Sequence, residues 1–290
     1  MQQRPGHPRY STAPAVVVSA VRAAKLISGG VDDIERGIKS IAKAMKGGAI
    51  GAAPAQSSFD PTLTNCVTGG AERLAQLTSM FCDSGSDKAL SLCISGPPGT
   101  GKSAYARYLA EKLGMEVIEK RASDLLSKWV GDSEKKIAGA FEEARSAGAF
   151  LIFDEADSLL GNRRDATRSW EVTQVNEMLT WMESHPLPFV CTTNLTERLD
   201  DAVWRRFLFK LKFDHMRREQ AESAFERFFG FKAPSGLRKL SMLTPADFAL
   251  VKRKAAVTNR LGSIVSLMEL LEQECASKPQ YARPIGFNSI

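Results

Sequence analysis

The chain carries a glycine-rich octapeptide at residues 96–103, Gly96-Pro97-Pro98-Gly99-Thr100-Gly101-Lys102-Ser103. This stretch matches the pattern G-x-x-x-x-G-K-[ST], a loop whose backbone N–H groups surround the phosphates of a nucleotide. An apolar run from Ala89 to Ile94 precedes the loop and is typical of a buried parallel strand, and a helix-forming segment follows from Lys102 to Leu113. Because strand, loop and helix occur in the order that the motif requires, they favour a phosphate site over a chance glycine-rich turn.

The residue types within the loop suit a triphosphate bound together with Mg²⁺. Glycines let the backbone close around an anion, and the helix that starts near Lys102 directs the positive end of its dipole at the phosphates. We expect Lys102 to reach the β- and γ-phosphates and the Ser103 hydroxyl to ligate Mg²⁺. The sequence therefore predicts that residues 96–103 bind a nucleoside triphosphate, as the corresponding loops of ATP- and GTP-binding proteins do.

Two carboxylates, Asp154 and Glu155, follow the apolar run 150–153. Because the carboxyl ends of parallel strands face the crevice in which such ligands bind, we expect Asp154 to hold Mg²⁺ beside the phosphates. Glu155 is then expected to act as the general base on the attacking water. The same residues would also suit the acidic first turn of a helix, but the phosphate loop upstream favours the catalytic interpretation.

Asn194 comes directly after the next apolar run, residues 188–193. A neutral amide at that strand end can orient the attacking water or contact the γ-phosphate without adding charge, although Asn is also common in turns. We expect Asn194 to position the water.

Two adjacent arginines, Arg205 and Arg206, precede another apolar segment. An arginine at the edge of a nucleotide-binding domain can act as an arginine finger, which neutralises the charge that develops in the transition state of phosphoryl transfer. Such a finger can come from a neighbouring subunit. The alternative is a surface pair bound to nearby carboxylates such as Asp200 and Asp201.

Strands alternate with helices from residue 71 to residue 213, which predicts an α/β fold with a parallel sheet covered on both faces. The predicted strands are residues 89–95, 116–121, 149–154, 187–193 and 207–213, and the predicted helices are 71–81, 102–113, 133–147 and 168–183. The expectation is therefore a nucleotide-binding fold with a five-stranded sheet between layers of helices.

The pattern becomes helical after Asp214, with predicted helices at 216–229, from Thr244-Pro245 onward, and at 263–274. The sequence thus predicts a nucleotide-binding domain at 59–214, a small α-helical lid at 215–276 and an irregular tail at 277–290.

Composition is that of an ordinary globular protein: 290 residues, 43% hydrophobic and 25% charged, with a net charge of +6. No apolar run approaches the roughly 20 residues that span a bilayer. Five cysteines without a C-x-x-C, and three histidines without an H-E-x-x-H, indicate neither a disulfide framework nor a zinc site. We expect a cytoplasmic protein without a transmembrane segment.

Most of the positive charge lies in residues 1–58, a stretch with eight Lys or Arg and three Asp or Glu. Its first part is rich in Pro, Ala, Ser and Gly and is expected to be partly disordered. Residues 31–46 predict one amphipathic helix, since Ile34, Ile38, Ile41 and Met45 recur at helical spacing. This basic arm is either a solvated extension or a weak contact for nucleic acid, an acidic protein or an anionic membrane surface.

Taken together, these motifs resemble those of AAA+ ATPases of the AAA family proper. The matching segments, which include its Walker A and Walker B motifs, are Gly96–Ser103, Ser127–Lys135, Leu151–Asp157, Thr192–Asn194 and Asp201–Phe207. The block around Trp129 and the Arg-Arg-Phe sequence are most similar to the branch that contains spastin, katanin and the ATPase that disassembles ESCRT filaments. Within that branch the chain resembles an unassigned prokaryotic relative.

The resemblance implies a homo-oligomer, a hexameric ring with ATP between subunits and with Arg205 or Arg206 acting on a neighbour's γ-phosphate. It also implies that Lys128, Trp129 and Val130 line a central pore and grip an extended polypeptide. Trp suits this role because it packs on any peptide side chain. Gly131 is expected to let the loop turn and Ser133 to cap the next helix.

The resemblance further suggests a second pore loop with Arg163, Arg164 and Arg168. In many relatives, a small polar residue of the second strand contacts the catalytic glutamate. Arg121 stands at that position here.

The favoured function is an ATP hydrolase that couples nucleotide turnover to remodelling or threading of a protein substrate. The alternative is an ATP-controlled assembly scaffold or switch that acts through the basic arm on nucleic acid or membrane. A DNA-associated loader is the third possibility, and the Trp129 loop argues against it.

Overall fold

The structure is a computed structural model that describes residues 59–68, 70–83, 89–127, 129, 131–163, 166, 168–195 and 199–278. The basic arm at 1–58, its predicted helix and nearly all of the tail predicted at 277–290 lie outside the described residues.

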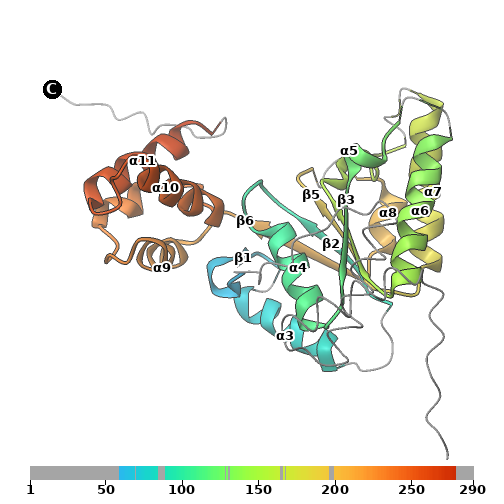
Figure 1. The fold of residues 1–290 in the computed structure, drawn as a ribbon, viewed down its shortest axis with the longest axis horizontal. Coiled ribbons are helices and arrows are strands. Elements are labelled where there is room, and N and C mark those ends of the chain that lie inside the picture. Colours follow the sequence, from blue (N-terminus) through green and yellow to red (C-terminus); the bar gives the residue numbers. More distant parts are fainter. Residues whose placement is uncertain are drawn as a thin grey trace, which may run out of the picture. The chain divides into compact units, whose positions relative to one another are not determined.

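A six-stranded sheet forms the centre of the domain predicted at residues 59–214, in the order β1-β6-β2-β5-β4-β3 (Figure 1). The strands are β1 (Asn65–Cys66), β2 (Ser91–Ser95), β3 (Val117–Arg121), β4 (Phe150–Asp154), β5 (Phe189–Thr193) and β6 (Phe209–Asp214). Strands β2 to β6 are parallel, so the predicted α/β class and the five parallel strands are confirmed. The prediction missed β1, which pairs antiparallel with β6, because two residues carry no periodicity.

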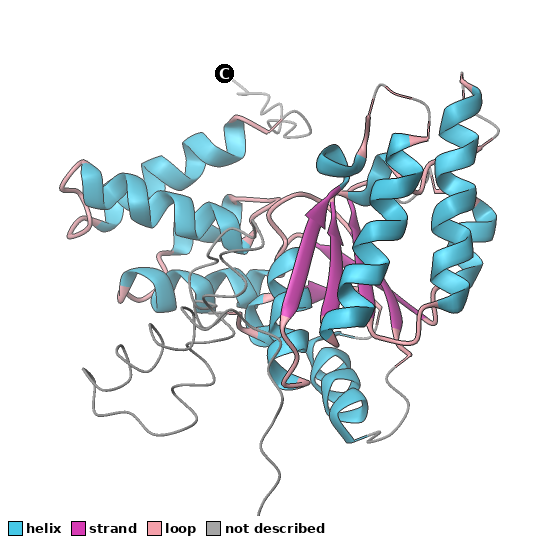
Figure 2. Cartoon of the chain, turned by 45° about the vertical axis from the view of Figure 1, so that its right-hand side comes forward, coloured by secondary structure: helices cyan, strands magenta, loops and turns pink. Residues whose placement is uncertain are grey.

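Helices cover both faces of the sheet, as Figure 2 shows. One face packs against α3 (Gly70–Asp83) and α4 (Lys102–Lys112). The other packs against α6 (Asp132–Ala147), α7 (Ser169–Ser184) and α8 (Asp201–Arg206). Alternate residues of the central strands therefore enter different apolar layers, and an uninterrupted apolar run such as residues 150–153 is what burial on both faces requires.

Short elements connect these layers and were not predicted. They are the 3₁₀ turns η1 (Pro61–Leu63) and η2 (Ala156–Ser158) and the helices α5 (Ala122–Leu125) and α8. Each spans six residues or fewer, which is too short for a helical period to be recognised.

A second apolar core lies in the helices after β6. These are α9 (Arg218–Phe229), the 3₁₀ turn η4 (Ser235–Lys239), α10 (Pro245–Val257) and α11 (Ile264–Ala276). Phe225, Phe248 and Leu267 are fully buried in this core. Thr244 begins α10 with a capping box, in which Thr244 N donates to Asp247 Oδ2 at 2.7 Å.

None of the helices that the structure describes is long and apolar enough to cross a bilayer.

Candidate nucleotide site

The loop between β2 and α4 has a backbone that requires glycine at two decisive positions. Gly96 has φ 143°, and a Cβ there would lie 2.1 Å from the carbonyl oxygen of Phe213. Gly101, which precedes α4, has φ 95°. A side chain at Gly96 would clash with the Phe213 carbonyl, and a side chain at Gly101 would strain its left-handed backbone. With glycine at both positions, the loop can leave the N-terminus of α4 open to an anionic ligand.

Lys102 is a nearly buried cation at the start of α4, with 8% of its surface exposed. Its Nζ donates to Gly96 O at 2.8 Å, Pro97 O at 2.9 Å and Asn194 Oδ1 at 2.7 Å. Burial lowers the pKa of Lys102 to about 8, and nearby carboxylates raise it only in part. A cation held mainly by neutral oxygens in a glycine-lined loop is suited to an anionic ligand.

Ser103 and Asp154 meet at the position expected of a magnesium site. Ser103 Oγ donates to Asp154 Oδ1 at 2.5 Å, although the two residues are 51 positions apart in the chain. Mg²⁺ prefers oxygen ligands and usually takes one or two carboxylates together with substrate phosphates and waters. One hydroxyl and one carboxylate beside a phosphate loop therefore fit the group, and no cluster of three or more His, Cys, Asp or Glu suited to a metal occurs elsewhere in the described part.

Glu155 follows Asp154 with an exposed side chain and a left-handed backbone, φ 53°. Its N–H donates to Thr192 Oγ1 at 3.0 Å. No described residue forms an ion pair or hydrogen bond with the Glu155 carboxylate, which leaves it available for a water. An unpaired carboxylate next to Asp154, the candidate Mg²⁺ ligand, is suited to a general base.

Asn194 is held in place by Asp157, a residue that sequence analysis did not assign to the site. Asp157 Oδ1 accepts from Asn194 N at 3.0 Å and from Leu195 N at 3.2 Å, and also from Thr193 Oγ1. The turn after β5 therefore presents the Asn194 side chain to Lys102. Two features of the sequence hint at this contact between Asp157 and the Asn194 turn. They are the second aspartate of Asp-Glu-Ala-Asp and the hydroxyl residues directly before Asn194.

Arg205 and Arg206, at the end of α8, differ in their surroundings. Arg206 binds Glu183, with Nε at 2.7 Å and Nη2 at 2.5 Å from Oε1. Arg205 is exposed and pairs with no described residue. Within the described chain, no hydrogen bond joins either arginine to the 96–103 loop.

The alternative partners suggested for these arginines, Asp200 and Asp201, bind neither of them in the described residues. Asp200 instead accepts from Ala202 N at 2.8 Å, which caps α8, and pairs with Arg163 at 2.8 Å. Arg163 Nη1 also donates to Asn176 Oδ1 at 2.8 Å. These contacts hold the Arg163 guanidinium against Asp200 and Asn176. That Arg163 belongs to a second pore loop stays a prediction.

The other two arginines of the expected second pore loop do not test that expectation. Arg164 lies outside the described residues, and Arg168 lies over the Trp170 ring at 5.7 Å.

The loop between α5 and α6 carries Trp129 with 80% of its surface exposed. Lys128 and Val130 lie outside the described residues. Gly131, with φ 81°, makes the turn before α6, as expected. The prediction that Ser133 caps α6 is wrong: α6 starts at Asp132, and the buried Ser133 hydroxyl accepts from Ser127 N at 2.8 Å.

The start of α10 contacts the phosphate loop, which sequence analysis also missed. Ala246 N donates to Gly99 O at 3.3 Å. A Cβ at Gly99 would lie 2.9 Å from both Ala246 Cβ and Thr244 Oγ1. In the sequence, Thr244-Pro245 indicates only the start of a helix. Its position against residue 99 depends on tertiary structure.

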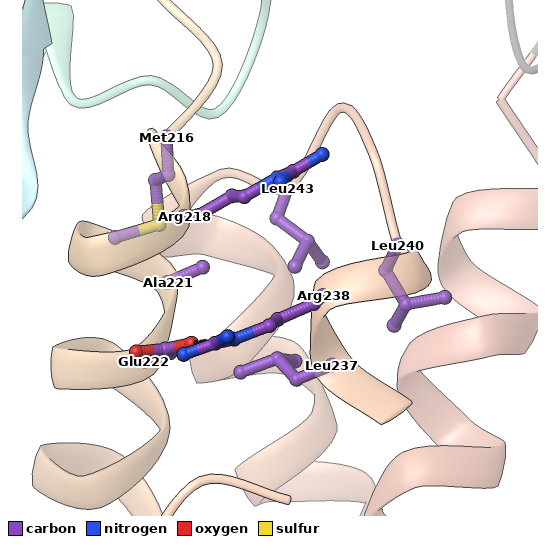
Figure 3. Close-up of a pocket in the computed structure, with 8 residues that line it drawn as sticks. All are labelled: Met216, Arg218, Ala221, Glu222, Leu237, Arg238, Leu240 and Leu243. Atoms are coloured by element: carbon purple, nitrogen blue, oxygen red, sulfur yellow. Dashed lines mark hydrogen bonds and ion pairs between the residues drawn. The ribbon is translucent and has the colours of Figure 1, made fainter. Parts of the chain in front are cut away.

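A pocket lies among the helices after β6, lined mainly by aliphatic side chains (Figure 3). Arg238 and Glu222 form an ion pair along its edge at 2.7 Å. The pocket is lined by Met216, Arg218, Ala221, Glu222, Leu237, Arg238, Leu240 and Leu243. It shares none of these residues with the phosphate loop, so it is not the nucleotide site.

Comparison with known families agrees with this geometry. Residues 92–215 match the family described as "ATPase family associated with various cellular activities (AAA)". This segment holds the whole of the 96–103 loop, both carboxylates, Asn194 and both arginines. The resemblance inferred from the motifs is therefore confirmed.

Three curated proteins are similar to part of this chain. "Protein SUPPRESSOR OF K(+) TRANSPORT GROWTH DEFECT 1" of Arabidopsis thaliana is 38% identical over 119 residues, 39% of this chain and 27% of that protein. "Spastin homolog" of Caenorhabditis elegans is 37% identical over 123 residues, 40% of this chain and 24% of that protein. "Vacuolar protein sorting-associated protein 4" of Dictyostelium discoideum is 36% identical over 122 residues, 40% of this chain and 28% of that protein. The matches span only about a quarter of each relative.

Proposed function

Because residues 92–215 form an AAA ATPase domain, we propose that the chain hydrolyses ATP and uses the turnover to remodel a protein substrate. The observation that carries the proposal is the network in which Lys102 bonds to Asn194 while Ser103 bonds to Asp154. It brings together residues from three segments of the chain, each with the chemistry that one step of phosphoryl transfer needs.

Each residue has a role in this proposal. Residues 96–101 and the N-terminus of α4 bind phosphate oxygens, and Lys102 exchanges its contacts with loop carbonyls for contacts with phosphate. Ser103 and Asp154 would hold the Mg²⁺, which would supply positive charge to stabilise the phosphates. Glu155 accepts the proton of the attacking water. Asn194, whose Oδ1 accepts from Lys102 Nζ, orients that water.

A homo-oligomeric ring, with six subunits as the expected number, completes the site. Arg205 is the better candidate for the finger that reaches a neighbour's γ-phosphate, because Arg206 is already paired with Glu183. The named relatives include a spastin homolog and a vacuolar sorting protein, in keeping with work on protein substrates. We place this activity in the cytoplasm, with a polypeptide held by Lys128, Trp129 and Val130 as the substrate.

No feature of the described residues favours the scaffold alternative, since its working surface would be residues 1–58.

Substituting Glu155→Gln tests the proposal. The amide cannot accept the proton, so we expect kcat to fall by about 100-fold or more. The affinity for ATP should stay within about threefold of wild type, because the phosphate loop is unchanged. Steady-state hydrolysis and binding of a fluorescent ATP analogue measure the two quantities.

The matched control is Glu142→Gln, an exposed carboxylate on α6 outside the site. It should hydrolyse ATP at the wild-type rate. Near-normal turnover by the Glu155 variant would contradict the base assignment, and a wild-type protein that binds no ATP with Mg²⁺ would contradict the function as a whole.

A further inference from the structure

Strand β5 ends in two buried threonines, Thr192 and Thr193, each with 1% of its surface exposed. Both lie directly before Asn194 in the chain. Because successive side chains of a strand point to opposite faces, the two hydroxyls serve different partners. Thr193 binds Asp157, whereas Thr192 binds the two residues proposed for metal binding and proton transfer.

The Thr192 hydroxyl uses both its donor and an acceptor lone pair. It donates to Asp154 Oδ1 at 2.6 Å and accepts from Glu155 N at 3.0 Å. A hydroxyl offers one proton and two lone pairs, so a single side chain can make both bonds at once. Thr192 therefore holds the Asp154 carboxylate that also accepts from Ser103, and at the same time holds the backbone of Glu155.

Glu155 needs such a restraint because its backbone is left-handed, φ 53°. Non-glycine residues adopt this conformation at a cost, and it persists only where surrounding contacts determine it. The direction of the Glu155 side chain depends on that backbone.

Strand β3, the other neighbour of β4, offers no equivalent restraint. Arg121 lies opposite Asp154 in the β3–β4 register and is exposed. No hydrogen bond or ion pair joins its side chain to Asp154 or Glu155 among the described residues.

From these contacts we propose that Thr192 is a positioning residue, which couples the end of β5 that carries Asn194 to the carboxylates at the end of β4. In this proposal, a displacement of Asn194 moves Thr193 and then Thr192, the last two residues of β5. Thr192 transmits the displacement to Glu155 through its hydrogen bond with the Glu155 N–H. The proposal rests on the proposed function, because Glu155 is the base in it.

Two substitutions separate the hydroxyl from the shape of the side chain. Thr192→Val removes the hydroxyl and keeps the β-branched shape, and Thr192→Ser keeps the hydroxyl. For the valine variant we expect kcat to fall by about 10- to 100-fold, with KM and ADP affinity within about threefold of wild type. The serine variant should recover most of the lost rate.

The control is Thr78→Val on α3, which also deletes a buried, hydrogen-bonded hydroxyl of this domain. It should keep the wild-type kcat. A loss as large as that of Thr192→Val would mean that any buried hydroxyl matters equally, and would overturn the positioning role.

Amide hydrogen exchange in the nucleotide-free protein gives a readout that needs no hydrolysis. Removing the acceptor at Thr192 should speed exchange at the Glu155 amide, and Thr192→Ser should slow it again. Unchanged exchange at Glu155 in Thr192→Val would overturn the proposal even if ATP hydrolysis were established. Conversely, a wild-type protein without ATPase activity would contradict the proposed function and leave the exchange result interpretable.

A double-mutant cycle with Glu155→Gln tests whether Thr192 acts through the base. If it does, adding Thr192→Val to Glu155→Gln should reduce the single-turnover rate by no more than about twofold. Losses that multiply would show that Thr192 acts elsewhere and would overturn the coupling.

Discussion

At the scale of single residues, burial shifts the pKa of side chains in this fold. His185 is a clear case outside the nucleotide site. It ends α7 with 6% of its surface exposed, and its ring lies 5.1 Å from that of Phe141. Neither ring nitrogen has a hydrogen-bond partner among the described residues. Burial, and to a lesser extent the nearby Arg145 cation, together lower the pKa of His185 from 6.5 to about 4.

This shift predicts a loss of stability in mild acid. The unfolded chain takes up a proton below pH 6.5 but the folded chain does not, so stability is complete above 6.5 and falls as the pH approaches 4. Between pH 7.5 and 5, His185→Leu should lose about 2 kcal/mol less free energy of unfolding than wild type. Urea unfolding at both pH values measures this. Equal losses in the two proteins would show that His185 is protonated without cost in the native state.

At the scale of elements, the loop between α5 and α6 is held at its base while its centre is exposed. Ser127 N donates to Ser133 Oγ, and Asp132 N donates to Trp129 O at 3.3 Å. These bonds close the loop around an indole that is 80% exposed, an arrangement that costs hydrophobic free energy unless a partner covers the ring. A rigid base with an exposed aromatic side chain suits transient contact with many peptide sequences.

Trp129→Ala should therefore separate hydrolysis from substrate work. We expect basal ATPase activity within about twofold of wild type, because no hydrogen bond or ion pair joins the described residues of this loop to residues 96–103. The stimulation of ATPase activity by a permanently unfolded, carboxymethylated polypeptide should be lost. Val265→Ala on α11, another strongly exposed apolar residue, is the control and should retain stimulation. Full stimulation of the Trp129 variant would rule out the gripping role.

At the scale of the whole molecule, the helices after β6 bond to residues 60–64 and to the 96–103 loop itself. Gln220 of α9 donates to Thr62 O and Thr64 O at 3.0 Å, and Ala246 of α10 donates to Gly99 O. Arg227 of α9 also pairs with Asp60. The bond between Ala246 and Gly99 thus joins the start of α10 directly to the candidate nucleotide loop.

Mixing two inactive variants tests whether sites are shared between copies. Arg205→Ala removes the proposed finger and Glu155→Gln removes the proposed base, so each variant alone should turn over at least about 100-fold more slowly than wild type. In mixed assemblies, a subunit with an intact Glu155 can adjoin one with an intact Arg205. The mixture should therefore regain a measurable fraction of wild-type ATPase activity. Arg206→Ala in place of Arg205→Ala should be the weaker defect, and a mixture without any recovery would exclude action between subunits.

Much of the site could be predicted because its signals are local. The order of strand, glycine loop and helix around Lys102, and the carboxylates directly after residues 150–153, depend only on neighbours in the chain and on the period of each element. The parallel sheet followed from the same alternation. The short strand β1 did not, because its pairing with β6 joins residues about 150 positions apart.

Local pattern by itself determined the α/β class, the phosphate loop and the identity of its cationic and acidic side chains. Tertiary structure alone decided that Thr192 holds Asp154 and Glu155, that Asp157 holds the turn of Asn194, and that Ala246 meets Gly99. It also decided that Arg163 is fixed by Asp200 and that Arg205 stays unpaired among the described residues. The physical reason is the same in each case: a hydrogen bond or ion pair between segments depends on where the packed layers bring their ends, and no periodicity within one segment encodes that distance.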